Sequence, residues 1–235
     1  MKILVACEES QAVCKAFRAK GHEAYSCDIL DCSGGHPEWH IKGDVLPILN
    51  GYCEFKTMDG IKHLIWSNWD MIIAFPPCTH LAVSGAAWFE KKRADGRQRE
   101  GIEFFCKLLN AECEKVVVEN PVGIISGDYI PKWFPDLAKR YNLPQRPNQI
   151  IHPWMFGDNH SKSTCLWEKG VAPLVPDVKE QPELEWFEWK DEKTGKIKRQ
   201  PKWYADAWWL SPKERAMVRT KTFPGIAQAM AEQWG

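Results

Sequence analysis

The sequence predicts an α/β fold in which helices cover both faces of a sheet. Runs of β-branched and aliphatic residues alternate along the chain with segments whose apolar residues recur at helical spacing. Two of the runs, 71–75 and 115–118, stop abruptly at proline or polar residues, as buried strands do where they leave a sheet. With 235 residues the chain is long enough to bury a sizeable core, and we expect one domain.

The first part of the chain predicts a β-α-β unit. Strands are expected at 2–6 and 23–29, with a helix at 10–20 between them. Ser10 is of the residue type that favours a helix N-cap. The second strand ends on Asp28, and nucleotide-binding folds use an acidic residue in this position to hold a ribose diol.

Cys78 and Glu119 follow two of the predicted strands. The strand at 71–75 is succeeded by two prolines and then Cys78, and the strand that starts at Lys115 is succeeded by Glu119. If these strands are neighbours, both side chains face one pocket at their carboxyl ends, where open α/β sheets bind ligands. Each residue also has a plainer interpretation, because single cysteines are usually small buried groups and glutamates are usually solvated.

The remaining segments complete the sheet and its helical cover. We expect a sheet-edge strand within 39–45, a helix at 102–109, strands within 150–167 and a final helix from Pro224. Residues 186–209 predict an aromatic hairpin around a Lys-Thr-Gly turn. Its aromatic and basic side chains could stack on and hold nucleic acid, or they could pack the hairpin onto the body, and both interpretations stay open.

The charges balance overall but not locally. Lys plus Arg and Asp plus Glu are both 31, so the chain has no global attraction for nucleic acid. The basic residues between 91 and 99 form either a solvated face or a contact for a phosphate backbone. Nine cysteines without a regular framework, and no signal peptide or membrane-length apolar run, predict a cytoplasmic protein. No metal is expected, because the cysteines and histidines between 27 and 53 lack Cys-x-x-Cys spacing.

Two segments carry a resemblance to a known family. FPPCTHLAVSG at 75–85 and VVVENPVGIIS at 116–126 resemble the Pro-Cys and Glu-Asn motifs of the DNA cytosine C5 methyltransferases, in particular the small phage-type members. The resemblance implies a Rossmann-like methyltransferase sheet with helices on both faces and a small C-terminal hairpin insertion. It implies that Cys78 is the nucleophile and that Glu119 contacts the base. From YNLPQR it implies that Arg146 helps to fix the base carbonyl, although the family's later arginine is absent.

The same resemblance implies S-adenosylmethionine as the cofactor. The turn after the first strand would cradle it, Asp28 would bind its ribose and Asp44 its adenine amine. This turn has the sequence CEESQ and lacks glycine, so a plain strand-to-helix turn stays open as an alternative. The C-terminal segment from 223 to 234 is expected to close the pocket. The residues expected at the cofactor are Cys7, Glu8, Glu9, Ser10, Asp28, Asp44, Phe75 and Pro76.

Cytosine-containing DNA is the partner that the resemblance implies, in the cytoplasm of a bacterium or a phage-infected host and without a membrane. A full target-recognition domain does not fit in this length, so residues 182–210 are expected to form a small substrate-recognition insertion. The residues expected to contact DNA are Thr79, Arg97, Arg99, Lys162 and Thr164.

Other functions remain open at this point. The same chemistry could act on RNA or on a free pyrimidine nucleotide. The chain could also be a non-catalytic DNA-binding protein with a methyltransferase fold. Amino-group methyltransferases share the strand-end prolines, but they typically carry an aromatic residue where this chain has Cys78.

Overall fold

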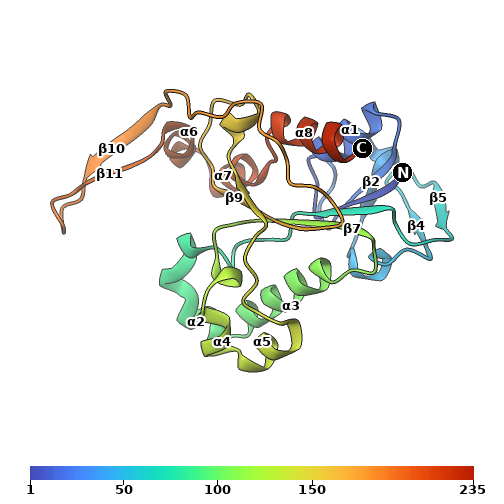
Figure 1. Cartoon of the computed structure of the whole chain (residues 1–235), viewed down its shortest axis with the longest axis horizontal. Helices are drawn as coiled ribbons and strands as arrows, with labels where there is room; N and C mark the ends of the chain where they lie inside the picture. The colour runs from blue at the N-terminus through green and yellow to red at the C-terminus, as the bar shows by residue number, and fades with distance from the viewer.

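The computed structural model describes the backbone of residues 1–235 and the side chains of all of them except 212, 213, 216 and 217. Its centre is a seven-stranded sheet in the order β3-β2-β1-β6-β7-β9-β8 (Figure 1). The first five strands in this order run parallel, and β9 runs antiparallel to both neighbours. The strands are β1 (Lys2–Ala6), β2 (Glu23–Asp28), β3 (His40–Lys42), β6 (Met71–Ala74), β7 (Lys115–Pro121), β8 (Gln149–Ile151) and β9 (Thr164–Lys169).

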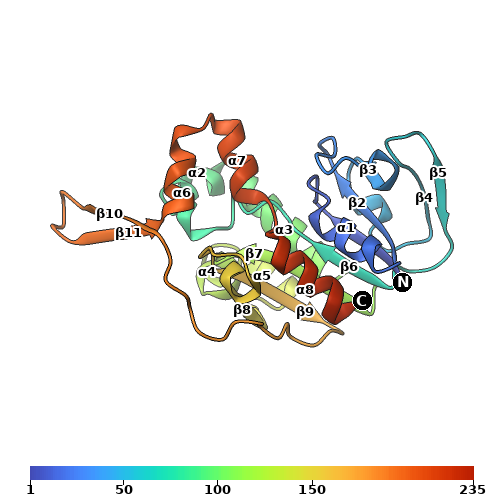
Figure 2. The same ribbon diagram turned by 90° about the horizontal axis from the view of Figure 1, so that it is seen from above.

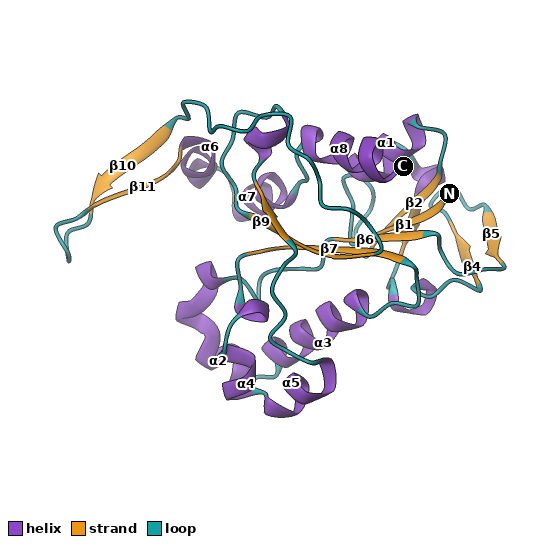
Figure 3. Ribbon diagram, viewed as in Figure 1, coloured by secondary structure: helices purple, strands orange, loops and turns teal.

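Helices cover both faces of this sheet (Figures 1 and 3). One face carries α1 (Ala12–Ala19) and α8 (Pro224–Trp234), and the other carries α3 (Arg97–Leu109). The remaining helices are α2 (Phe89–Ala94), α4 (Tyr129–Trp133), α5 (Pro135–Tyr141), α6 (Lys202–Asp206) and α7 (Pro212–Thr220). Two hairpins lie outside the main sheet, β4 (Cys53–Lys56) with β5 (Lys62–Ile65), and β10 (Trp186–Lys190) with β11 (Ile197–Pro201). In the described part of the chain, no helix has the length and apolar character needed to cross a bilayer.

This architecture confirms the predicted α/β fold with a mainly parallel, Rossmann-like sheet. From β1 the chain adds β2 and β3 on one side, and it then crosses to the other side of β1 with β6 and β7 (Figure 2). The strand order therefore reverses between β1 and β6, which pair as far as Ala6 and Ala74. Open α/β sheets bind ligands at the carboxyl ends of the strands beside such a reversal.

The start of α1 differs from the prediction that Ser10 caps it. The N-cap is Gln11, which has a φ of 57°, and its side chain makes no hydrogen bond to the helix amides. Instead, the buried carboxylate of Glu8 accepts hydrogen bonds from the amides of Val13 at 2.6 Å and Cys14 at 3.2 Å. The first amides of a helix lack partners within it, and a carboxylate that can reach two of them is a stronger acceptor than one hydroxyl.

Two other elements differ in extent from their predictions. The helix expected at 102–109 begins at Arg97, directly after Gly96, whose φ is 84°. The hairpin expected over 186–209 is present, but its second strand ends at Pro201. The aromatic residues that follow lie in α6 and in a 3-10 helix at Ala207–Trp209. Proline has no amide proton to continue the ladder, and its fixed φ suits the residue that precedes a helix.

The core lies in two layers that the sheet separates. Along β7, Val116 and Val118 belong to the layer under α3, whereas Val117 belongs to the layer under α1 and α8. Because side chains alternate along a strand, Glu119 points to the same side as Val117. This alternation decides which face of the sheet carries the candidate site.

Glu168 on β9 gives a prediction for stability. Neither of its buried carboxyl oxygens has a hydrogen-bond partner among the described residues, and burial raises its pKa to about 7. The folded protein therefore binds this proton more tightly than the unfolded chain does. The resulting stabilisation is present at low pH and is lost as the pH rises through 7.

We predict that Glu168→Gln changes stability little at about pH 5 and raises the free energy of unfolding at about pH 8 by up to about 3 kcal/mol. Urea unfolding of both proteins at the two pH values checks this. An equal difference at both pH values would show that the carboxyl group is not the cause.

Candidate active site

The loop that carries Cys78 is held against the strands on both sides of it. The Phe75 amide donates a hydrogen bond to the Ala6 carbonyl at the end of β1, at 2.9 Å. On the other side, Nδ2 of Asn120 donates to the Pro76 carbonyl at 2.9 Å, and Asn120 is only 1% exposed. The two prolines therefore leave β6 in a fixed direction, with Cys78 just beyond the sheet edge.

Backbone hydrogen bonds fasten the rest of the loop to the segment after β7. The amides of Leu81 and Ala82 both donate to the Cys78 carbonyl at 2.9 Å, which forms a tight turn. The Ile124 amide then donates to the Leu81 carbonyl at 3.0 Å. A Cβ on Gly123 would lie 2.5 Å from the Leu81 carbonyl oxygen, so this approach requires glycine. The two sequence motifs thus lie side by side, as the pairing of β6 with β7 requires.

Lys162 joins these two residues from a third segment. Glu119 pairs with Leu166 of β9, and β9 begins at Thr164, opposite Pro121. Because β9 is antiparallel to β7, the residues just before its start lie beyond the carboxyl end of β7. Lys162 is one of them, and its Nζ lies 6.0 Å from the centre of the Phe223 ring.

These side chains share one electrostatic environment. Burial, and then the charge of Glu119, raises the pKa of the Cys78 thiol, while the charges of Lys162 and Lys92 lower it. Burial likewise raises the pKa of Glu119, and Lys162 opposes this shift. The arrangement places a thiol near a carboxyl group whose pKa is raised, with two cations that favour the thiolate.

Lys92 lies at the candidate site, although no sequence pattern distinguishes it from its basic neighbours. It lies in the basic run after the Cys78 loop, yet it is only 8% exposed. Its Nζ donates to the Thr79 carbonyl at 2.5 Å. Lys92 therefore fixes the backbone next to Cys78 as well as lowering the pKa of its thiol, while the Thr79 side chain is left exposed. Among the basic residues from 91 to 99, Lys92 is distinguished by its burial, which the sequence does not reveal.

The two arginines that were expected to contact DNA, Arg97 and Arg99, form ion pairs with carboxylates of the protein itself. Arg97 forms an ion pair with Asp95, and Arg99 forms ion pairs with Asp136 and Glu103. Arg146 is exposed in the loop before β8, and among the described residues its guanidinium has no hydrogen bond or ion pair. Thr164 is buried on β9, where its Oγ1 donates to the Lys162 carbonyl at 3.4 Å. The structure thus brings Cys78, Glu119 and Lys162 together, but places these arginines in other surroundings.

The turn after β1 is stabilised by its own polar residues. Cys7 has a φ of 59°, and the Glu8 carboxylate accepts hydrogen bonds from the first amides of α1. Glu9 pairs with the Ser33 hydroxyl, while Ser10 is partly buried. Gln11, which is fully buried, donates to the His36 carbonyl at 2.8 Å and accepts from the His36 amide at 3.1 Å. Side-chain hydrogen bonds thus shape a turn that lacks glycine.

Acidic and apolar groups surround the carboxyl ends of β1 and β2. Burial, and then the charges of Asp28 and Asp44, raise the pKa of the Cys7 thiol, so both carboxylates lie near it. Ile29 and Leu30 follow Asp28 and are 73% and 57% exposed. This combination offers hydrogen-bond acceptors next to an uncovered aliphatic surface, a chemistry that suits a nucleoside.

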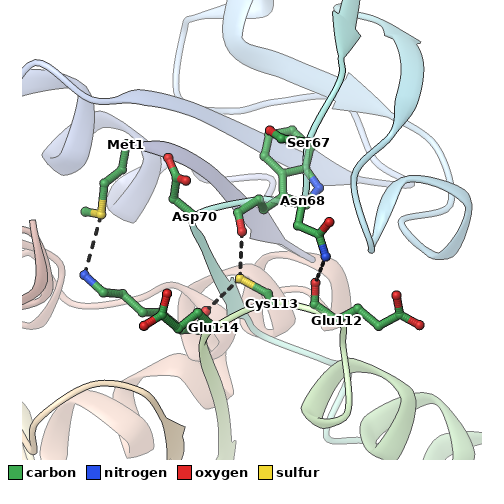
Figure 4. A pocket seen from close by; sticks show the side chains of 9 residues that line it. Met1, Ser67, Asn68, Asp70, Glu112, Cys113 and Glu114 are labelled. Atoms are coloured by element: carbon green, nitrogen blue, oxygen red, sulfur yellow. Dashed lines mark hydrogen bonds between the residues drawn. The ribbon is translucent and has the colours of Figure 1, made fainter.

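A groove lies at the opposite end of the sheet, away from Cys78. It has a volume of about 800 Å³ at the amino ends of β1, β6 and β7 (Figure 4). Within it, Asn68 donates to the Glu112 carbonyl at 2.6 Å and Cys113 to the Trp69 carbonyl at 3.0 Å. No cluster of three or more His, Cys, Asp or Glu side chains suited to a metal occurs among the described residues. The lining residues are Met1, Ser67, Asn68, Trp69, Asp70, Glu112, Cys113, Glu114 and Lys115.

Comparisons with known proteins find similarity among solved structures. No protein-family model matches the chain, and no curated protein matches it. Among solved structures, the chain is similar to a candidate DNA modification methyltransferase encoded within a prophage (E. coli), with a TM-score of 0.42 and 12% sequence identity. The match covers 89% of this chain and 64% of that one, so the chain spans less than two thirds of the length of this protein.

Proposed function

We propose that this protein transfers a methyl group from S-adenosylmethionine to C5 of cytosine in DNA, through a covalent adduct with Cys78. The observation that supports this most is that Cys78 follows β6 while Glu119 lies near the carboxyl end of the adjacent parallel strand β7, and that the charge of Lys162 acts on both. Cytosine C5 is a weak nucleophile, so an enzyme has to add a group to the ring before C5 can accept a methyl. A thiol beside a proton donor provides this addition.

In the proposed mechanism, Cys78 first loses its proton, a step that Lys162 and Lys92 favour. The thiolate then bonds to C6, and the electron pair of the C5–C6 double bond moves into the ring. Glu119 donates its proton to N3, which neutralises the charge that develops there and makes C5 enamine-like. In duplex DNA the base must first leave the stack, at a cost of a few kcal/mol.

When bound, S-adenosylmethionine supplies an electrophilic methyl group at C5. The proton on C5 is then lost to solvent, the C5–C6 double bond forms again, and Cys78 leaves as the thiolate. N3 returns its proton to Glu119, and the Cys78 thiolate regains a proton from solvent, so the enzyme ends the cycle in its starting state. Sulfur suits Cys78 because the same atom must both attack and leave near neutral pH.

The residues at the carboxyl ends of β1 and β2 fit this cofactor. Asp28 offers a carboxylate to the ribose diol, and Asp44 offers one to the adenine amine. Ile29 and Leu30 are exposed in the described chain, and a purine ring would cover such a surface. Phe75 and Pro76 lie between this region and Cys78, in position to contact the reacting end of the cofactor.

The contacts with DNA are assigned to the site and to the C-terminal hairpin. Lys162 lies beside the proposed base pocket, so we assign to it, in place of Arg146, the cation that contacts the base. The exposed Thr79 side chain is free to contact the DNA strand. Residues 182–210, with the hairpin at their centre, form the proposed substrate-recognition insertion.

Trapping with a fluorinated base tests this proposal. We expect that incubation with S-adenosylmethionine and an oligonucleotide containing 5-fluorocytosine yields a covalent adduct on Cys78, because fluorine cannot leave C5 as a proton does. Denaturing gels detect the adduct and peptide mass spectrometry locates it. Absence of an adduct on single-stranded and double-stranded DNA, while S-adenosylmethionine binds, would refute the proposed reaction. An adduct only with RNA would refute the assignment of the substrate.

A further inference from the structure

The β10–β11 hairpin projects from the body beyond α6, where Figures 1 and 2 show it at one extreme of the long axis. Its base is fixed by a hydrogen bond from the Lys202 amide to the Glu185 carbonyl at 2.9 Å. Its turn is closed by Gly195, with a φ of 65°. The hairpin is thus a defined two-stranded ribbon, with both of its faces available to a partner.

The strand register assigns the side chains to these two faces. Phe187 pairs with Gln200 and Trp189 with Lys198, and these cross-strand pairs share one face. The opposite face carries Trp186, where the Arg199 guanidinium lies 4.5 Å from the ring centre and covers it. The first of these faces is called the aromatic face below.

The aromatic face offers two uncovered rings in a row. Phe187 is 50% exposed and Trp189 is 38% exposed. Their ring centres are 6.0 Å apart and their planes are inclined by 30°. Two adjacent exposed rings cost free energy in water, and they are an arrangement on which successive flat groups can stack.

The charge of the ribbon indicates the partner. Residues 186–201 contain five Lys or Arg and three Asp or Glu, in a chain whose totals are equal at 31. The excess charge is therefore local, as expected of a contact with a polyanion. On the aromatic face, Lys198 lies opposite Trp189 and forms an ion pair with Asp191, while Gln200 lies opposite Phe187, where its side-chain amide can reach base edges.

We propose that the aromatic face of this hairpin binds an unpaired stretch of DNA by stacking bases on Phe187 and Trp189, an inference that rests on the proposed function. Base faces are covered by their neighbours in a duplex, and the major groove presents base edges that need polar partners. A single strand exposes its base faces, and aromatic rings next to basic side chains bind such strands with little dependence on sequence.

The test uses fluorescence anisotropy of a labelled oligothymidine strand, alone and annealed to its complement, with the full chain. Thymine already carries a methyl group at C5, so binding is measured without the proposed reaction. We expect the single strand to bind more tightly than the duplex. Replacing both rings, Phe187→Ala with Trp189→Ala, should weaken binding of the single strand by about tenfold or more.

Ile197→Ala is the matched control, because Ile197 is 74% exposed on the opposite face of the same hairpin. It should leave binding unchanged. Unchanged binding by the double variant, tighter binding of the duplex, or no binding of oligothymidine would each overturn the inference. These outcomes are independent of the 5-fluorocytosine adduct, so failure of this inference can be distinguished from failure of the proposed function.

Discussion

Replacing Cys78 with serine is expected to reduce methyl transfer by on the order of 10³-fold or more, because the other site residues cannot act without the nucleophile. A serine hydroxyl does not ionise near neutral pH, and the buried site disfavours an anion further. Binding of S-adenosylmethionine should persist, since the proposed cofactor contacts come from other segments. The measurement is incorporation of labelled methyl into DNA by the variant and by the unaltered protein.

The control for this variant is Cys53→Ser, at a partly buried cysteine of β4 outside the site. It should transfer methyl groups at the normal rate. If Cys78→Ser kept a rate within about tenfold of the unaltered protein, the covalent mechanism would be excluded. An equal fall in rate in both variants would show instead that replacing any cysteine disturbs the fold.

The position of Cys78 was predictable because local sequence determines it. An apolar run that stops at two prolines has to be a strand that ends, and the residue that follows has to lie at the sheet edge. The same reasoning placed Glu119 after its own strand, and this was wrong in detail: pairing with β9 continues β7 to Pro121, so Glu119 lies within the strand near its carboxyl end. That the two strands are neighbours followed only from the hypothesis of a shared pocket, and the pairing of β6 with β7 confirms it.

Lys162 and Glu8 show what depends on long-range structure. Lys162 was expected to contact DNA, but its position beside Cys78 and Glu119 comes from the antiparallel return of β9 along β7, a pairing that no local pattern encodes. Glu8 was expected at the cofactor, but it caps α1, because burial next to two free helix amides outweighs the appearance of a polar turn. Both outcomes depend on which segments the fold brings together. Residue type alone does not determine them.

The second large effect is expected at Glu119. Glu119→Gln should lower methyl transfer by about 10²-fold to 10⁴-fold, the range found when a positioned acid is removed. Because burial raises the pKa of Glu119, transfer by the unaltered protein should decline as the pH rises through that pKa and the carboxyl group loses its proton. The variant should lack this limb of the pH profile, since glutamine does not titrate.

The same substitution should have an opposite effect on the thiol. The charge of Glu119 raises the pKa of Cys78, so Glu119→Gln should lower that pKa and speed alkylation of Cys78 by iodoacetamide at pH values above the pKa of Glu119, where its carboxyl group is charged. Peptide mass spectrometry separates Cys78 from the other cysteines. Glu168→Gln is the control, because Glu168 is a buried carboxyl group whose charge is not among those that shift the Cys78 pKa. Slower transfer together with faster alkylation requires Glu119 to lie beside the thiol and to act in the reaction. A parallel loss of both would mean that the substitution had only distorted the site.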